Sequence, residues 1–108
     1  MEIQQKIIKA NGIILSIEDG GKEVAHAYLY ILFNLHDRPF GLMEDVYVAE
    51  NSRSKGLGTK LVQELIKVAK QHDCYKLIGT SRYVRPKIHD WYVRLGFKDW
   101  GKEFRMDF

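Results

Sequence analysis

The stretch from Val46 to Leu61 constrains the fold most, because a strand pattern changes to a helix pattern within it. Gly56 and Gly58 stand where the turn becomes the helix, and Arg53 and Lys55 place two cations beside them. The first N–H groups of a helix lack acceptors within the helix, and the helix dipole makes that end positive. Glycines also let a ligand approach the backbone closely. The stretch therefore predicts a phosphate or pyrophosphate site, and the alternative is an ordinary turn with solvated charges.

Two common phosphate-binding motifs are excluded by residue order. A P-loop requires Gly-x-x-x-x-Gly-Lys-Ser/Thr, whereas the order here is Gly58-Thr59-Lys60. A dinucleotide fingerprint requires Gly-x-Gly-x-x-Gly, and Leu61 stands where its third glycine belongs. The motif that remains is Arg-x-x-Gly-x-Gly, from Arg53 to Gly58.

The first half of the chain has the pattern of an antiparallel meander. Asn11-Gly12 and Asp19-Gly20-Gly21 are turn signals between apolar runs. They predict strands at residues 3–9, 13–18, 24–33 and 42–48.

The second half adds helical periodicity. A helix is expected from Leu57 to about His72-Asp73, because apolar residues recur on one helical face. A buried strand follows at 75–81, then a short helix from Pro86 to about Leu95 with Gly96 as its stop, and a hairpin over 97–108. The predicted order is β-β-β-β-α-β-α-β-β, an α/β fold with a mixed sheet, in one domain covering residues 1–108.

Composition excludes several classes of protein. A chain of 108 residues with a formal charge of +3 is mildly basic, and no long basic run concentrates the charge, so an anionic cofactor is favoured over a nucleic-acid surface. The lone Cys74 forms no internal disulfide and fits a cytoplasmic, reducing compartment. No apolar run approaches the length of a membrane span, and the four histidines lack metal-ligand spacing. We therefore expect no metal and no membrane contact.

Two motifs together resemble the GNAT superfamily of N-acetyltransferases. The first is Arg53 to Gly58, which is similar to the acyl-CoA pyrophosphate loop of that superfamily. The second is Asp90 to Phe97, a helix that carries Tyr92 and is followed by Leu-Gly-Phe. The resemblance covers roughly residues 42–97, with both motifs in the expected order, and it implies the GNAT fold and acetyl-CoA as co-substrate.

The resemblance implies a cofactor role for three segments. The pantetheine arm would pair with the main chain of the strand before the loop, and the pyrophosphate would lie on loop N–H groups. The implied cofactor-binding residues are Val46, Tyr47, Val48, Arg53, Ser54, Lys55, Gly56, Leu57, Gly58, Thr59, Arg85 and Ile88.

The resemblance also implies catalytic roles. A tyrosine at the position of Tyr92 commonly protonates the departing CoA thiolate, and the alternative is a ring that packs on the sheet. Glu44 is our choice for the base that deprotonates the amine, because a similar Leu-Glu-Asp stands in spermidine/spermine acetyltransferases. Asp45 is the alternative base, since strand alternation sends the two carboxylates to opposite faces unless a bulge intervenes. Either carboxylate can instead be a solvated strand residue.

The sequence departs from the superfamily in two places. Arg85 replaces a common asparagine, and His89 lies one turn from Tyr92, where it either serves the acceptor or is structural. The family normally inserts two helices between its first two strands, whereas Asn11-Gly12 is expected to join them directly. The acceptor side would then be open or completed by a homodimer, with Trp91, Trp100 or the last strand as contacts.

The sequence therefore predicts direct acetyl transfer from acetyl-CoA to a primary amine, on a protein lysine, a protein N-terminus or a small amine. The alternative is a non-catalytic module that senses acyl-CoA and regulates a partner. A third interpretation is an RNA-binding domain led by Arg82 and Arg85, although the absence of a long basic run favours an anionic cofactor over nucleic acid.

Overall fold

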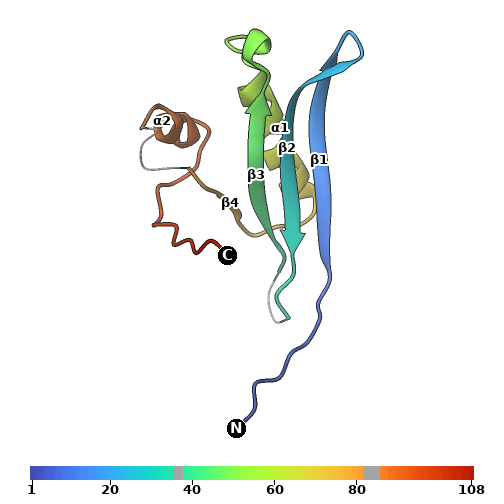
Figure 1. The fold of residues 1–108 in the computed structure, drawn as a ribbon, viewed down its shortest axis with the longest axis vertical. Coiled ribbons are helices and arrows are strands. Elements are labelled where there is room, and N and C mark those ends of the chain that lie inside the picture. Colours follow the sequence, from blue (N-terminus) through green and yellow to red (C-terminus); the bar gives the residue numbers. More distant parts are fainter. Residues whose placement is uncertain (36–37, 82–85) are drawn as a thin grey trace. The chain divides into compact units, whose positions relative to one another are not determined.

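The fold is a mixed four-stranded sheet with one long helix on it, followed by a second helix (Figure 1). The computed structural model describes residues 1–35, 38–81 and 86–108. These divide into two compact units, residues 1–78 and 79–108, which are treated separately below. The prediction of one domain over the whole chain stays a prediction.

Strands β1 (Ala10–Asp19), β2 (Lys22–Leu32) and β3 (Phe40–Val48) form an antiparallel meander. Gly20 and Gly21 make the β1–β2 turn with φ of 61° and 81°, as the sequence predicted. Short β4 (Leu77–Gly79) lies next to β3 in the sheet. Two backbone hydrogen bonds, Tyr75 N–H to Pro39 O and Gly41 N–H to Lys76 O, are both 2.9 Å long. Residue numbers increase together along these two segments, as in a parallel pair.

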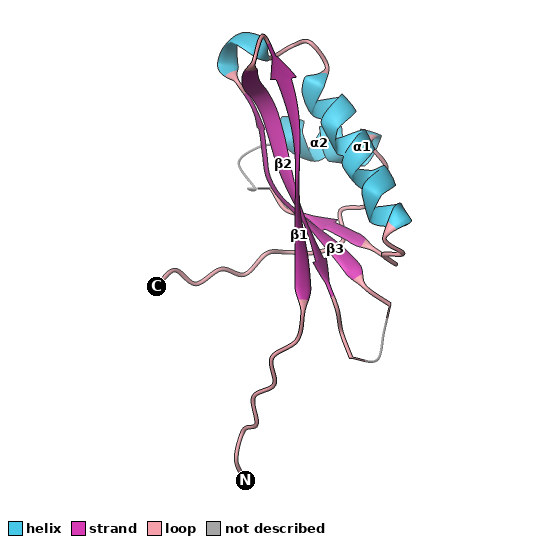
Figure 2. Cartoon of the chain, turned by 90° about the vertical axis from the view of Figure 1, so that its right-hand side faces the viewer, coloured by secondary structure: helices cyan, strands magenta, loops and turns pink. Residues whose placement is uncertain are grey.

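Helix α1 (Leu57–Gln71) covers one face of this sheet (Figure 2). Its buried residues, Leu61, Val62, Leu65 and Ala69, recur at helical spacing. Alternate β2 residues form the opposing surface and are almost fully buried, namely Ala25, Ala27, Leu29 and Ile31. Each fully buried leucine or isoleucine contributes about 1.5–3 kcal/mol to folding, so this layer is the core of the first unit.

Helix α2 (Pro86–Arg94) lies in the second unit and ends as the sequence predicted. Gly96 has φ of 106°, and its N–H donates to Val93 O at 3.0 Å. The N–H of Phe97 donates to Tyr92 O at 3.1 Å, and the rings of these two residues lie 5.4 Å apart. This is a Schellman termination with its usual apolar contact.

The predicted strand at 3–9 and the Asn11-Gly12 turn are wrong. Residues 1–9 form no strand, and β1 includes both turn residues, with Asn11 opposite Ile31 and Gly12 opposite Tyr30. A regular ladder with β2 satisfies more backbone groups than a turn at this point would. A Cβ at position 12 would make only an ordinary contact, 3.5 Å from Tyr30 Cε1, so the packing at this point does not require glycine.

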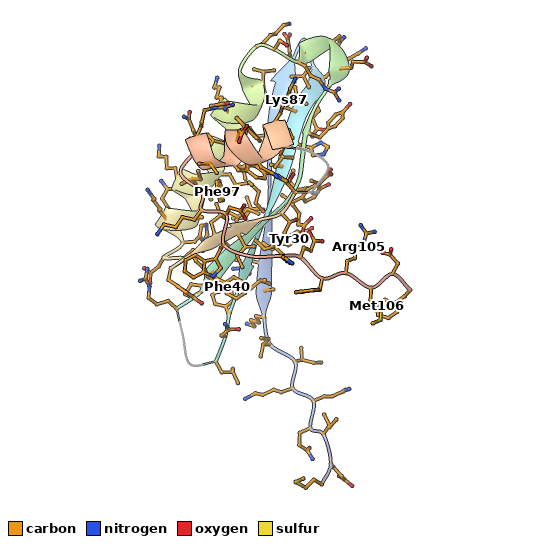
Figure 3. All side chains as sticks on the ribbon, turned by 90° about the vertical axis from the view of Figure 1, so that its left-hand side faces the viewer. Tyr30, Phe40, Lys87, Phe97, Arg105 and Met106 are labelled. Carbon is orange, nitrogen blue, oxygen red and sulfur yellow. The ribbon has the colours of Figure 1, made fainter. Side chains whose placement is uncertain are left out.

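The predicted hairpin over 97–108 is also wrong. Residues 97–108 form no strand, and Figure 3 shows Arg105 and Met106 on an extended segment. Phe104 and Phe108, whose alternation suggested a strand, are exposed. Alternation alone stabilises no strand without a paired neighbour. The described order is therefore β-β-β-α-β-α, which keeps the predicted mixed sheet but not its first strand or its last two.

Candidate functional site

The turn between β3 and α1 is built by the residues that the sequence singled out. Ala49 N–H donates to Val24 O at 2.8 Å and closes the pairing with β2, and a 3-10 turn, η1 (Glu50–Ser52), follows. The Arg53 side chain then folds back, with Nε donating to Val48 O at 2.9 Å. One donor of Arg53 therefore fastens the turn to the end of β3.

The backbone turns sharply before α1. Ser54 and Gly56 have φ of 68° and 73°, in the left-handed region that favours glycine. Gly56 is the N-cap, and within the described residues no side chain caps this end by a hydrogen bond. The N–H groups of the first helical turn have no acceptor within the helix. Because no acidic residue lies in that turn either, this end of α1 is suited to an anion.

The strand before the turn offers main-chain groups along one edge. β4 is three residues long, whereas β3 continues to Val48. In an antiparallel strand, the N–H and C=O of one residue face the same edge, and those of the next residue face the opposite edge. Since Ala49 bonds β2, the groups of Val48 face the other edge, where Arg53 takes the carbonyl. An extended ligand arm along this edge would therefore meet Val48 through its N–H.

A bulge near Glu44, which the sequence left open, is present in β3. Glu44 lies opposite Tyr28 and Tyr47 lies opposite His26, so β3 uses one residue more than β2 between these pairs. Asp45 lies in the bulge with φ of 50°. The bulge brings Glu44 and Tyr47 to the same face of the sheet, away from α1, instead of opposite faces. Both side chains are exposed.

A histidine that the sequence reasoning missed lies beside this bulge. His26 Nδ1 is 2.9 Å from Glu23 Oε2, and His26 Nε2 is 2.9 Å from Asp45 Oδ2. The hydrogen bond with Glu23 is the largest cause that raises the pKa of His26; burial opposes it, and Asp45 adds to it. Neither contact follows from spacing alone, because residues three apart on a regular strand lie on opposite faces. The Glu23 contact depends on the register shift between β1 and β2, and the Asp45 contact depends on the register of β3 on β2.

In the second unit, Tyr92 is half-buried between two other rings. Its ring lies 5.2 Å from Trp91 and 5.4 Å from Phe97, measured between centroids. Ile88 and His89 on the same helix are also half-buried. Arg82 and Arg85, the basis of the RNA interpretation and of one cofactor contact, lie outside the described residues. The structure therefore gives a packed position for Tyr92 within its own unit.

Other candidates carry little chemistry. Burial is the largest cause that raises the pKa of the Cys74 thiol, and nearby Asp73 adds to it. A raised pKa reduces the thiolate fraction, so Cys74 is a poor nucleophile. In the part of the chain that the structure describes, no three His, Cys, Asp or Glu side chains are arranged to hold a metal ion. None of the described helices combines the length and apolarity needed to cross a membrane.

Comparison with known proteins identifies the family. The profile of the Acetyltransferase (GNAT) family matches residues 2–97. The chain belongs to the GNAT acetyltransferase family. This match confirms the resemblance inferred from the two motifs.

Curated GNAT relatives share one printed activity. Glucosamine 6-phosphate N-acetyltransferase of Candida albicans is 41% identical over 63 residues, covering 58% of this chain and 40% of that protein. The Trypanosoma brucei brucei enzyme of the same name is 34% identical over 89 residues, covering 81% of this chain and 58% of that protein. The chain thus spans about half the length of these relatives.

Solved structures of GNAT proteins match most of the chain. Glucosamine-6-phosphate N-acetyltransferase from Arabidopsis thaliana has a TM-score of 0.82 and 27% identity, covering 90% of this chain and 67% of that one. A Trypanosoma brucei acetyltransferase has a TM-score of 0.78 and 28% identity, covering 92% and 69%. These matches confirm the predicted fold class.

Proposed function

We propose that this chain binds acetyl-CoA and transfers its acetyl group to a primary amine. The observation that carries the proposal is the turn from β3 to α1, where left-handed Gly56 opens a helix whose first N–H groups lack acceptors within it. Lys55 is exposed beside this helix start. A pyrophosphate on the N–H groups of residues 54–59 would gain both the helix dipole and hydrogen bonds.

The cofactor arm is assigned to the edge of β3 that faces away from β2. In this proposal the main chain of Val46, Tyr47 and Val48 pairs with the pantetheine amides as an added strand. The fit is chemical, because Val48 retains an N–H toward that edge while Arg53 holds its carbonyl. Leu57, Gly58 and Thr59 supply the first helical turn, and Arg85 and Ile88 stay as proposed contacts on the basis of family resemblance.

The proposed reaction is direct attack. The amine nitrogen attacks the acetyl carbonyl carbon, a tetrahedral oxyanion forms, and the carbon–sulfur bond breaks as the amide forms. Glu44 takes the proton that the amine loses, and Tyr92 donates a proton to the thiolate. Both roles rest on family resemblance; exposure of Glu44 and its separation from the His26 contact support its choice over Asp45.

The proposed acceptor is an amino sugar phosphate. This follows from the printed activity of the curated relatives, whose matched segments reach 41% identity. An amino sugar phosphate is a narrower class of acceptor than the primary amine expected from sequence. We prefer it to the polyamine that the similarity around Glu44 suggested. No observation favours the regulatory alternative.

Self-association and a cytoplasmic location belong to the same proposal. Trp100 and Phe104 are 88% and 90% exposed in the second unit, and exposed aromatic groups are typical of interfaces. Analytical ultracentrifugation of wild type and Trp100→Ser tests the homodimer, which a monomeric wild type at micromolar concentration would exclude. The cytoplasmic location rests on Cys74, and imaging of a fluorescent fusion tests it.

Calorimetric titration with acetyl-CoA tests the cofactor assignment. Wild type should bind with micromolar affinity, and Gly58→Trp should lose binding because an indole fills the space beside the helix start. Lys67→Trp is the matched control, since it places the same side chain on an exposed position of α1. Equal binding by wild type and Gly58→Trp would contradict the assigned loop.

Release of the CoA thiol tests catalysis and the acceptor. Glucosamine 6-phosphate, spermidine and a lysine peptide should be offered at equal concentration, and the amino sugar phosphate should give the highest kcat/KM. Tyr92→Phe and Glu44→Gln should each lower kcat by about 10²-fold or more. Binding of acetyl-CoA without thiol release from any acceptor would favour the non-catalytic alternative.

A further inference from the structure

His26 is held between carboxylates from two different strands. Its two ring nitrogens lie 2.9 Å from Glu23 on β2 and 2.9 Å from Asp45 on β3. Ionised carboxylates only accept hydrogen bonds, and a neutral imidazole has one N–H. Both contacts are therefore hydrogen bonds only when His26 is an imidazolium, which donates from both nitrogens.

The ring is fixed in place by packing as well. The His26 side chain is 19% exposed, and its ring lies 5.7 Å from Tyr28 and 5.3 Å from Tyr47. On β1 the residue opposite His26 is Ser16, which carries no charge. The titratable groups that pair with His26, lie beside it or lie opposite its partners are Glu18 of β1, Glu23 and Tyr28 of β2, and Glu44, Asp45 and Tyr47 of β3.

The carboxylate that His26 holds belongs to the strained residue of the bulge. Asp45 has φ of 50°, a left-handed conformation that is strained in a residue with a Cβ. The hydrogen bond from protonated His26 acts against that strain, because it holds the Asp45 carboxylate at the position that the bulge gives it. The bulge in turn sets which β3 groups face each edge and each face of the sheet.

We propose that protonated His26 is a positioning residue that locks the β3 bulge and so aligns the β3 main chain for acyl-CoA. The proposal deepens the proposed function, since it rests on β3 as the strand that pairs with the pantetheine arm. Loss of the His26 proton removes one of its two hydrogen bonds. Acyl-CoA affinity should therefore fall as pH rises through the pKa of His26.

NMR without ligand tests the lock itself. The His26 ring should titrate above the ordinary histidine pKa of about 6.5, and the amide shifts of Asp45, Val46 and Tyr47 should follow the same curve. Glu23→Gln changes a side chain that is 48% exposed. It should lower the His26 pKa, and the titration curves of the ring and of the β3 amides should shift by the same amount. If the amide chemical shifts of β3 do not change with pH along the His26 titration curve, the proposal is overturned.

Calorimetry with acetyl-CoA tests the consequence for binding. From about pH 6 to about pH 9 the wild-type affinity should fall about fivefold more than that of His26→Gln, which stays uncharged. The comparison at matched pH removes the titration of the CoA phosphate. His72→Gln, exposed at the end of α1, is the control and should behave as wild type.

The outcomes separate this proposal from the proposed function. A His26→Gln profile identical to wild type, with tight binding by both, would overturn the positioning role and leave acyl-CoA binding intact. No binding by wild type at any pH would overturn acyl-CoA binding and with it the functional consequence of the lock. The NMR curves would then still decide whether His26 locks the bulge.

Discussion

Replacement of Gly41 by alanine should destabilise the first unit, and the structure gives the reason. Gly41 is buried on β3, where its N–H bonds Lys76 O. An added Cβ would lie 2.9 Å from Leu77 Cδ1 and 3.1 Å from Leu29 Cδ1. Leu77 is half-buried and can shift, whereas Leu29 is fully buried and cannot move without disturbing the core.

The magnitude follows from two opposing terms. Overpacking a core typically costs about 1–3 kcal/mol. Replacing glycine by alanine at an unstrained position gains about 0.4–1 kcal/mol, because the unfolded chain has fewer conformations. Gly41→Ala should therefore lower the free energy of unfolding by about 1–2 kcal/mol, which urea denaturation measures through the midpoint.

Two matched variants make the explanation refutable. Gly12→Ala places a Cβ 3.5 Å from Tyr30, an ordinary contact, so its stability should equal or slightly exceed that of wild type. Leu77→Ala removes one clashing side chain, and the double variant with Gly41→Ala should show favourable coupling of about 0.5 kcal/mol or more. Equal stability of Gly41→Ala and Gly12→Ala, or no coupling with Leu77→Ala, would refute the steric argument.

The remaining predictions concern the site. Gly56→Ala should cost about 1–2 kcal/mol, because φ of 73° is strained for alanine, and should weaken acetyl-CoA binding; unchanged thermal stability would contradict this. The folded-state pKa of His26 is raised, so the stabilisation by its charged form is full below about pH 6.5 and is lost as pH rises through the folded-state pKa. Urea midpoints of wild type and His26→Gln, measured across this pH range, test the prediction. Midpoints of the two proteins that change in parallel with pH would contradict it. Glu44→Gln should lower kcat with little change in acetyl-CoA affinity, whereas Asp45→Asn should mainly weaken that affinity; the reverse pattern would exchange their roles.

The parts of the site that the sequence predicted depend on local signals. Gly56 and Gly96 stand where the backbone adopts positive φ. The spacing of the apolar residues in α1 correctly predicts which face of the helix is buried. Such signals involve residues close together in the sequence, so they can be interpreted without knowledge of the tertiary fold. This is why the turn into α1 and the end of α2 were predicted correctly.

The errors arise where a pattern needs a distant partner. The residues Phe104, Met106 and Phe108 alternate as in a strand, and residues 3–9 contain isoleucines before a turn signal. Neither pattern says which strand will pair with the segment, and Ile7 and Phe108 are exposed. Asn11-Gly12 is a turn signal only when the adjacent run folds back, and pairing with β2 prevailed. The His26–Asp45 contact was missed for the same reason, because 19 residues separate its partners.

The bulge in β3 depends on both local sequence and pairing with a distant strand. Sequence alone left Glu44 and Asp45 as alternatives, since a regular strand separates them to opposite faces. The register of β3 on β2 shows that Asp45 occupies the bulge, and Asp45 already accepts a hydrogen bond from His26.

To take a proton from an amine, Asp45 would have to give up that hydrogen bond and the support that the bond provides to its own strained backbone. Glu44 precedes the bulge, is exposed on the face that carries Tyr47, and has no such contact to lose in the described structure. We therefore propose that Asp45 maintains the strand that would hold the cofactor, and that Glu44 is the base.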